Sequence, residues 1–130
     1  PDLARMKEFV KDPVLFRFEY ADGLKATMFL MNGLVGDFTF AARIKGQTAP
    51  LSTLFYLPPV PNVTYSAALM SKAEETFRTG KAPYPVERTL LTGGLVEAGM
   101  QSLHAGQKRL ETPHLAIRYQ PTRESTFSQS

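Results

Sequence analysis

The two histidines are the side chains of this 130-residue sequence best suited to proton transfer or metal binding near neutral pH. His104 and His114 are ten residues apart, and neither belongs to an H-x-x-x-H pair. Two ligands on one helix face need a spacing of three or four residues, so a metal site is not indicated. We interpret His104 as a residue near a helix C-terminus, where the helix dipole favours positive charge. His114 follows Pro113, and we interpret it as a packing residue at the start of a strand.

The carboxylates and hydroxyls do not form a recognisable catalytic group either. Glu74 and Glu75 are adjacent in a predicted helix and point in different directions, unlike the two members of an acid–base pair. Ser66, Ser71 and Ser102 have no evident neighbouring base, so a Ser-His-Asp arrangement is not indicated. These residue types therefore predict no catalytic residue in this chain.

Motifs that bind cofactors are missing from the sequence as well. No G-x-G-x-x-G follows a predicted strand, and there is no P-loop. Gly93 and Gly94 lie within a helical pattern and do not read as a phosphate-binding loop. There is no cysteine, which excludes disulfides, thiolate chemistry and Cys-based zinc sites. Such a composition fits a reducing compartment, and we expect a cytoplasmic protein with no cofactor or metal bound by this chain.

Size and charge narrow the remaining classes of function. The length is sufficient for one domain with its own core. The net charge of +3 is small and evenly spread, and no Lys/Arg run is interleaved with aromatic residues, so we expect no nucleic-acid partner. No apolar run approaches the roughly 20 residues that span a bilayer, so we expect no membrane partner. The sequence begins at Pro1 in the middle of a residue pattern, so whether Pro1 is a natural start or a fragment boundary stays open.

A helix of about twenty residues at 84–106 is the element around which the chain is organised. Pro83 and Pro85 set its start, and Glu87 stabilises the positive end of its dipole. Two faces are apolar: Leu91, Leu95 and Ala98 share one, and Val96, Met100 and Leu103 share the opposite one. Glycines at 93, 94 and 99 each cost about 1 kcal/mol in a helix, so we expect a neighbour, most simply a sheet, close to its backbone.

Four segments alternate apolar and polar residues with the period of a strand, at 14–20, 24–31, 37–45 and 51–57. Asp22-Gly23 is a strong signal for a tight turn between the first two. Because all the connections are short, we predict an antiparallel meander of four strands.

The remaining segments complete the predicted order of elements. Residues 2–11 are weakly helical, and Tyr65, Leu69, Ala73 and Phe77 form the stripe of a second main helix that ends at Gly80. Short strand-like pieces follow at 109–111 and 115–119. Segregated strands and helices predict an α+β fold, an open, mainly antiparallel sheet with two helices packed on one face. We divide the chain into a lead-in segment at 1–12, one domain at 13–119 and a polar tail at 120–130.

One predicted sheet face mixes apolar and charged side chains. Its candidate interaction residues are Phe29, Met31, Asp37, Arg43, Leu54 and Tyr56. Such a mixture is typical of a surface that meets another protein, and we expect the chain to form a homo-oligomer through it. An ordinary solvated face is the alternative interpretation.

Three stretches of the sequence resemble a known family over about residues 10–119. They are the Y-x-D-G turn from Tyr20 to Gly23, the junction TGKAPYPVERTLLT into the long helix, and the ending G-x-x-x-x-E-T-P-H-L from Gly106 to Leu115. Together they resemble the C-terminal domain of the glucose–fructose oxidoreductase and inositol dehydrogenase (Gfo/Idh/MocA) family.

The resemblance implies a part of a two-domain NAD(P)-dependent oxidoreductase that acts on sugars, cyclitols or similar polyols. In that family an N-terminal Rossmann domain holds the dinucleotide and carries a Glu-Lys-Pro motif, and neither feature is present in this sequence. The C-terminal domain lines the substrate side of the cleft, and its sheet builds dimers or tetramers. The resemblance thus implies NAD(P) for a full-length member, a Rossmann domain as intramolecular partner, and no turnover by this chain alone.

Two other hypotheses stay open on the sequence. One is a stand-alone structural or protein-binding domain of the same fold without redox activity. The other is a small enzyme that uses the sheet as a ligand platform, with Asp37, Arg43 and Tyr56 as polar candidates.

Overall fold

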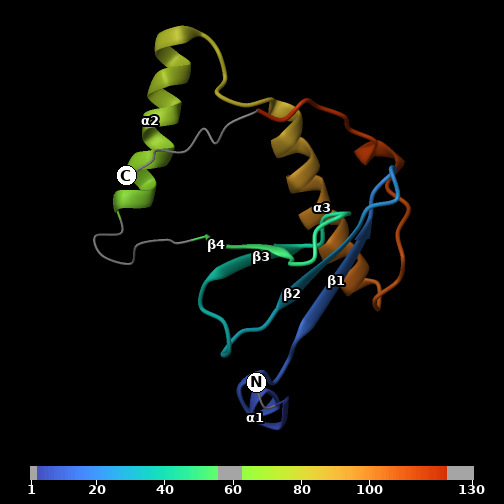
Figure 1. Cartoon of the computed structure of the whole chain (residues 1–130). Helices are drawn as coiled ribbons and strands as arrows, with labels where there is room; N and C mark the ends of the chain where they lie inside the picture. The colour runs from blue at the N-terminus through green and yellow to red at the C-terminus, as the bar shows by residue number, and fades with distance from the viewer. Residues whose placement is uncertain (1–2, 56–62, 123–130) are drawn as a thin grey trace. The chain divides into compact units, whose positions relative to one another are not determined.

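The computed structural model describes residues 3–55 and 63–122 of the chain (Figure 1). The chain divides into two compact units, Pro1–Pro59 and Val60–Ser130. Strands occur in the first unit and the two long helices in the second, so the predicted α+β class is confirmed. The predicted packing of both helices on one sheet face stays a prediction.

The first unit begins with the short helix α1, Leu3–Phe9, which ends two residues before the end of the predicted helical segment at 2–11. The end of α1 lies against the turn that follows the second strand. A β-carbon on Gly33 would lie 2.5 Å from the Phe9 carbonyl oxygen, and Gly33 has a φ of +92°. Only glycine satisfies both conditions, so this turn is fixed by its contact with α1.

Strands β1, Val14–Glu19, and β2, Lys25–Leu30, form an antiparallel hairpin. Val14, Phe16 and Phe18 on β1 are half-buried and alternate with exposed neighbours, as the sequence predicted. At the turn, the Leu24 amide donates to Asp22 Oδ1 at 3.0 Å, and the Gly23 amide donates to the Tyr20 carbonyl at 2.9 Å. The predicted Asp-Gly turn is therefore confirmed.

Strands β3, Phe38–Ala42, and β4, Leu51–Phe55, form a second antiparallel hairpin. Among the described residues no ladder joins β2 to β3, so the predicted continuous meander is wrong at that step. The connection between them turns sharply instead: the amides of Leu34 and Val35 both donate to the Met31 carbonyl at 3.2 Å. This turn separates β2 from β3, and β3 pairs with β4 instead.

The second unit begins with helix α2, Val63–Thr79, whose predicted stripe includes Leu69, Ala73 and Phe77. The side chain of Tyr65, the fourth predicted member of that stripe, lies outside the described residues. Gly80 has a φ of +67°, and its amide donates to the Thr76 carbonyl at 2.9 Å, which confirms the predicted C-terminal glycine.

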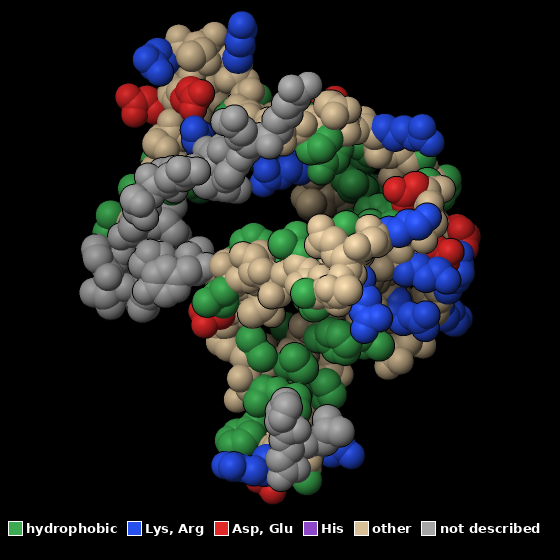
Figure 2. All heavy atoms as spheres, viewed as in Figure 1, with side chains coloured by type: hydrophobic (Ala, Val, Ile, Leu, Met, Phe, Trp, Pro, Cys, Tyr) green, Lys and Arg blue, Asp and Glu red, His purple; other side chains and the backbone are tan. Residues whose placement is uncertain are grey.

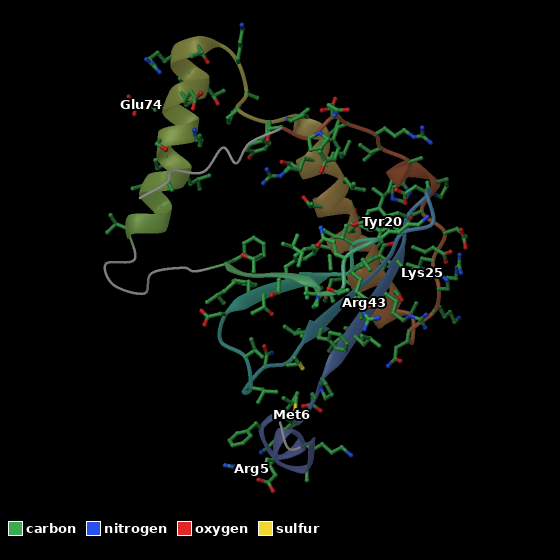
Figure 3. All side chains as sticks on the ribbon, in the orientation of Figure 1. Arg5, Met6, Tyr20, Lys25, Arg43 and Glu74 are labelled. Carbon is green, nitrogen blue, oxygen red and sulfur yellow. The ribbon has the colours of Figure 1, made fainter. Side chains whose placement is uncertain are left out.

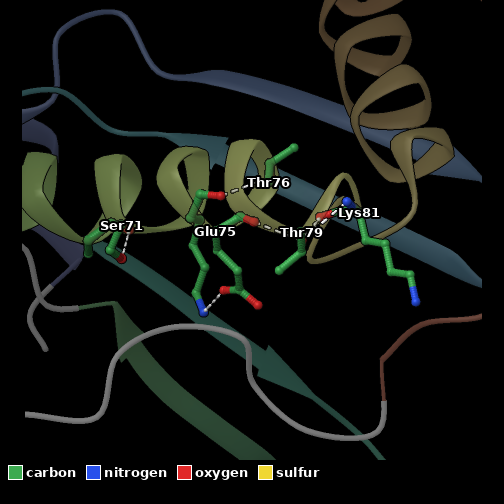
Figure 4. Close-up of polar contacts among 7 residues, drawn as sticks. Ser71, Glu75, Thr76, Thr79 and Lys81 are labelled. Atoms are coloured by element: carbon green, nitrogen blue, oxygen red, sulfur yellow. Dashed lines mark hydrogen bonds and ion pairs between the residues drawn. The ribbon is translucent and has the colours of Figure 1, made fainter.

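Polar contacts along α2 and at its end are shown in Figure 4. Thr79 Oγ1 donates to the Glu75 carbonyl at 2.7 Å and accepts from the Lys81 amide at 3.2 Å. Lys72 Nζ forms an ion pair with Glu75 Oε2 at 3.0 Å. These bonds fix the first residues of the connection that leaves α2.

Helix α3, Val86–His104, is the long helix that the sequence predicted. It begins directly after Pro85 with Glu87 in its first turn, and the Arg88 guanidinium lies 4.4 Å from the centre of the Tyr84 ring. Gly99 is its buried residue. Leu115, in the 3₁₀ helix η1 (Pro113–Leu115), occupies the space that a β-carbon on Gly94 would need. The predicted close approach to the α3 backbone is thus made at Gly94 by a side chain of the same unit.

Hydrogen bonds to the residues that follow α3 cap its C-terminal end. The Gln107 amide donates to the Ser102 carbonyl at 2.8 Å, and Ser102 Oγ donates to the Lys108 carbonyl at 2.6 Å. Gly106 has a φ of +79°, which a glycine adopts without strain. This arrangement turns the chain back from the end of α3 toward η1.

The predicted strands at 109–111 and 115–119 are wrong, because the structure forms η1 and irregular chain there. Pro113 has no amide hydrogen to donate to a ladder, and the amides of Leu115 and Ala116 bond to carbonyls three residues back. Leu115, Ile117 and Tyr119 are nevertheless half-buried and alternate with exposed residues. The alternation in the sequence therefore reflects a segment at 115–119 with one half-buried side, and not a strand. Of the predicted polar tail, residues 123–130 lie outside the described part.

Candidate interaction faces

The strand unit exposes large hydrophobic side chains on both hairpins (Figure 2). Among the residues that the structure describes, no hydrophobic side chain is fully buried. A folded domain ordinarily buries most of its Leu, Ile, Val and Phe side chains, each worth about 1.5–3 kcal/mol. We therefore take the exposed apolar surfaces of the chain as its candidate functional site.

The residues that the sequence assigned to an interaction face fall on both hairpins. Phe29 lies on β2 opposite Leu15 of β1, and both are exposed. Leu54 lies on β4 opposite Thr39 of β3, with 53% of its surface exposed. The structure thus supports exposure at both apolar positions, and it places them in two different strand pairs.

The polar and flanking candidates lie at the strand ends. Asp37 and Arg43 are exposed residues that border β3 on its two sides, and Figure 3 shows Arg43 beside the strands. Met31 is half-buried in the turn after β2, where its backbone carbonyl accepts two amide hydrogen bonds. Tyr56 lies outside the described residues. No ion pair or hydrogen bond that the structure describes joins Asp37 to Arg43, so these groups form no polar site together.

Sequence reasoning did not single out the opposite face of the second hairpin. Phe38 and Phe55 are cross-strand neighbours, with 65% and 55% of their surfaces exposed, and Phe40 lies on the same face. The alternation of β3 and β4 places these phenylalanines on one face, and their exposure depends on whether a second layer covers that face. This three-phenylalanine face is the most aromatic exposed surface in the described part of the strand unit.

The helical unit exposes two further apolar faces. The α2 face consists of Val63, Leu69, Met70, Ala73 and Phe77, and 89% of the Phe77 surface is exposed. Ala67, Met70, Ser71, Ala73, Glu74 and Phe77 line an open hollow along it, and Figure 3 shows Glu74 on α2. The outward face of α3 consists of Val86, Leu90, Gly93, Val96, Met100 and Leu103. It lies opposite the side of α3 that carries Gly94 and Gly99.

The described residues do not assemble catalytic or metal-binding groups. Nowhere in 3–55 and 63–122 do three or more His, Asp or Glu side chains gather as metal ligands would. His104 ends α3 and His114 lies in η1, and both are exposed. Ser102 and Ser71 each donate to a backbone carbonyl, which makes both hydroxyls structural. This arrangement is suited to binding surfaces and offers no acid–base pair.

The described residues also do not fit a dinucleotide. A pyrophosphate site needs a strand that runs through a glycine-rich loop into the N-terminus of a helix. Here β1 leads into β2 and β3 leads into β4, and α3 begins after the proline-rich segment at 83–85. The described elements therefore lack the strand–loop–helix unit that holds a pyrophosphate.

None of the helices in the described ranges is both long enough and apolar enough to cross a bilayer. Comparison of the chain with protein-family models, curated proteins and solved structures found no match. The family resemblance consequently rests on the three sequence stretches alone.

Proposed function

We propose that this chain is the C-terminal, substrate-lining and oligomerising domain of an NAD(P)-dependent oxidoreductase that acts on a sugar or polyol. In this proposal another part of the protein holds the dinucleotide, and the chain alone is inactive. The protein works in the cytoplasm, in keeping with a sequence that contains no cysteine.

The observation that carries the proposal is the exposure of large apolar side chains on both β-hairpins. Phe29 and Leu15 lie uncovered on the first hairpin, and Phe38, Phe55 and Leu54 on the second. Exposed apolar surface of this extent marks contact with another protein surface. A domain that contacts both a Rossmann domain and a second subunit needs more than one such apolar face.

The two faces of the second hairpin have different parts in this proposal. The face with Leu54, Thr39 and Ala41 belongs to the candidate set and pairs with a second copy. The three-phenylalanine face on the other side is covered within one protein, because aromatic side chains of this size are the usual content of a permanent core. Oligomerisation and domain closure therefore use separate surfaces.

Dinucleotide binding by the full gene product that carries this chain tests the proposal. Titration with NADH and with NADPH, followed by fluorescence, is expected to show saturable binding of at least one of them. Reduction of NAD(P)+ in the presence of a panel of sugars and cyclitols is expected to follow, and the isolated chain is the matched control that binds neither nucleotide.

A gene product that binds no dinucleotide contradicts the proposal. If that product still self-associates through the Leu54 face, the stand-alone protein-binding domain is the function that remains. If it binds a polyol without a dinucleotide, the ligand-platform hypothesis is supported instead.

A further inference from the structure

Two turns of the strand unit contain an acidic or amide residue directly before a glycine, Asp22-Gly23 and Asn32-Gly33. In such a pair the amide nitrogen of the glycine can attack the side-chain carbonyl carbon of the preceding residue and close a five-membered imide ring. Glycine favours this reaction because it has no β-carbon to obstruct the approach and restricts the backbone least. The two turns differ in how their hydrogen bonds hold the reacting groups.

Hydrogen bonds hold both reacting groups of the Asp22-Gly23 pair. The Gly23 amide, which would be the attacking group, donates to the Tyr20 carbonyl at 2.9 Å. The Asp22 side chain accepts from the Leu24 amide through Oδ1 at 3.0 Å. Closing an imide ring would break both of these bonds. The first hairpin turn therefore protects its own Asp-Gly pair.

The Asn32-Gly33 pair has no such bonds within residues 3–55 and 63–122. In those ranges the Gly33 amide donates to no carbonyl, and the Asn32 carboxamide makes no hydrogen bond. The turn is closed one residue further on, by the amides of Leu34 and Val35, which both donate to the Met31 carbonyl at 3.2 Å. That distance is at the long end of the usual range. Asn32 and Gly33 are also exposed, so the second turn leaves its reacting pair unprotected.

We propose that Asn32 is a site of spontaneous deamidation, at which the folded chain converts this asparagine to aspartate and isoaspartate without an enzyme. The Gly33 nitrogen bonds to Cγ of Asn32, the Cγ–Nδ2 bond breaks, and ammonia leaves with the proton of the Gly33 amide. Water then opens the imide at either of its two carbonyls. Water is the only other reactant, no group is oxidised or reduced, and the reaction is independent of the proposed redox function.

The reaction products do not fit this turn as asparagine does. Gly33 lies so close to the Phe9 carbonyl oxygen at the end of α1 that not even a β-carbon would fit between them. Isoaspartate adds one carbon atom to the main chain between residues 32 and 33, so Gly33 cannot keep both this contact and the closed turn. Both products also place a negative charge on the residue next to that contact. We therefore expect deamidation to separate α1 from the turn.

Peptide mapping of the full gene product after incubation at mildly alkaline pH tests the reaction. The tryptic peptide 26–43 contains Asn32 and no other asparagine, and we expect it to separate into an unreacted, an aspartate and an isoaspartate form. Isoaspartate identifies the imide route, since direct hydrolysis gives aspartate alone. Asn62 is the internal control, because the branched side chain of Val63 obstructs attack and should slow the loss of its amide at least about tenfold. Loss at Asn32 no faster than at Asn62 overturns the proposal.

Denaturant distinguishes the two turns. Unfolding should accelerate isomerisation at Asp22, measured in the tryptic peptide 18–25, by at least about tenfold, because the two hydrogen bonds that hold its reacting groups are lost. The rate at Asn32 should rise by a smaller factor, because its reacting groups are held by no such bonds. An acceleration at Asn32 as large as that at Asp22 overturns the proposal, since the folded turn would then protect Asn32 as well.

Asn32→Gln is the matched variant for the structural consequence. Glutamine keeps the amide and the neutral charge, but it would have to close a six-membered ring, so it should survive the same incubation. Hydrogen exchange at the Val10 amide, which donates to the Met6 carbonyl at the end of α1, and at the Leu34 amide reports whether α1 and the turn have separated. Exchange at both should become faster in the incubated natural protein and stay unchanged in Asn32→Gln. Equal exchange in the two proteins overturns the expected separation.

Discussion

The side chain of Leu115 lies where a β-carbon on Gly94 would otherwise be. This contact joins η1 to α3. Leu115 ends the E-T-P-H-L stretch of the family resemblance, and Gly94 lies two residues after the end of the junction stretch at Thr92. The glycine at 94 therefore has a packing role, whereas the glycine at 93 faces open space.

Gly94→Ala is expected to be less favourable than Gly93→Ala by about 1 kcal/mol, because the new methyl group has to shift the end of the Leu115 side chain and this offsets the gain in helix propensity. Gly93→Ala is the matched control at the neighbouring position, and it should be neutral or stabilising by up to about 1 kcal/mol. Urea unfolding followed by circular dichroism measures both. Equal effects of the two substitutions would show that Leu115 does not pack as described.

The turn of the first hairpin depends on a left-handed residue at Gly23, whose φ is +87°. Gly23→Ala should cost about 1–2 kcal/mol, since an L-residue is strained in that conformation. Gly36→Ala is the control, because Gly36 also has no neighbour within 4 Å but does not have a positive φ. Thermal unfolding should separate the two variants. A loss at Gly36 as large as that at Gly23 would contradict this account of the turn.

The hydroxyl of Ser102 closes the end of α3 by donating to the Lys108 carbonyl at 2.6 Å. Ser102→Ala should cost about 1 kcal/mol and increase hydrogen exchange at the amides near residues 105–107. Ser71→Ala is the control: its hydroxyl donates to the Ala68 carbonyl within an exposed helix, and alanine compensates with higher helix propensity. If the exchange rates near residues 105–107 do not change in Ser102→Ala, the hydroxyl does not close the helix end.

Association through the strand hairpins is assigned to the face that carries Leu54. Leu54→Asp should lower the oligomer fraction of the full gene product, because a charge would be buried in an apolar contact. Gln47→Asp is the control, because Gln47 is exposed in the turn between β3 and β4 and lies on neither face of the strands. Sedimentation velocity measures the fractions. Equal dissociation by Gln47→Asp would show that the added charge, and not the Leu54 face, governs association.

Local patterns predicted the elements of this chain well. Alternation located β1 to β4, and prolines with a terminal glycine bounded α2 and α3 within a few residues. The Asp22-Gly23 turn and the glycine end of α2 at Gly80 follow from backbone conformations that the sequence specifies directly. These features depend on neighbours in the chain, so a single sequence contains the information for them.

Features that depend on distant partners were predicted less well. The turn at Gly33 lies against Phe9, a contact that no local pattern encodes. Leu115, Ile117 and Tyr119 alternate with exposed residues as in a strand, but the described segment forms η1 and irregular chain. Among the candidate interaction residues, Phe29 and Leu54 are exposed, and Met31 is half-buried in the turn after β2. Alternation predicts an apolar side of a strand without identifying what covers it, as the exposed phenylalanines of β3 and β4 show.

The intact mass of the gene product, measured from the cell that makes it, tests the central claim most directly. The account predicts a protein about three times as long as this chain, with this sequence as its C-terminal part, since a Rossmann domain has to accompany it. A product no longer than this chain would contradict the claim. The uncovered faces on the hairpins and helices would then serve protein binding alone.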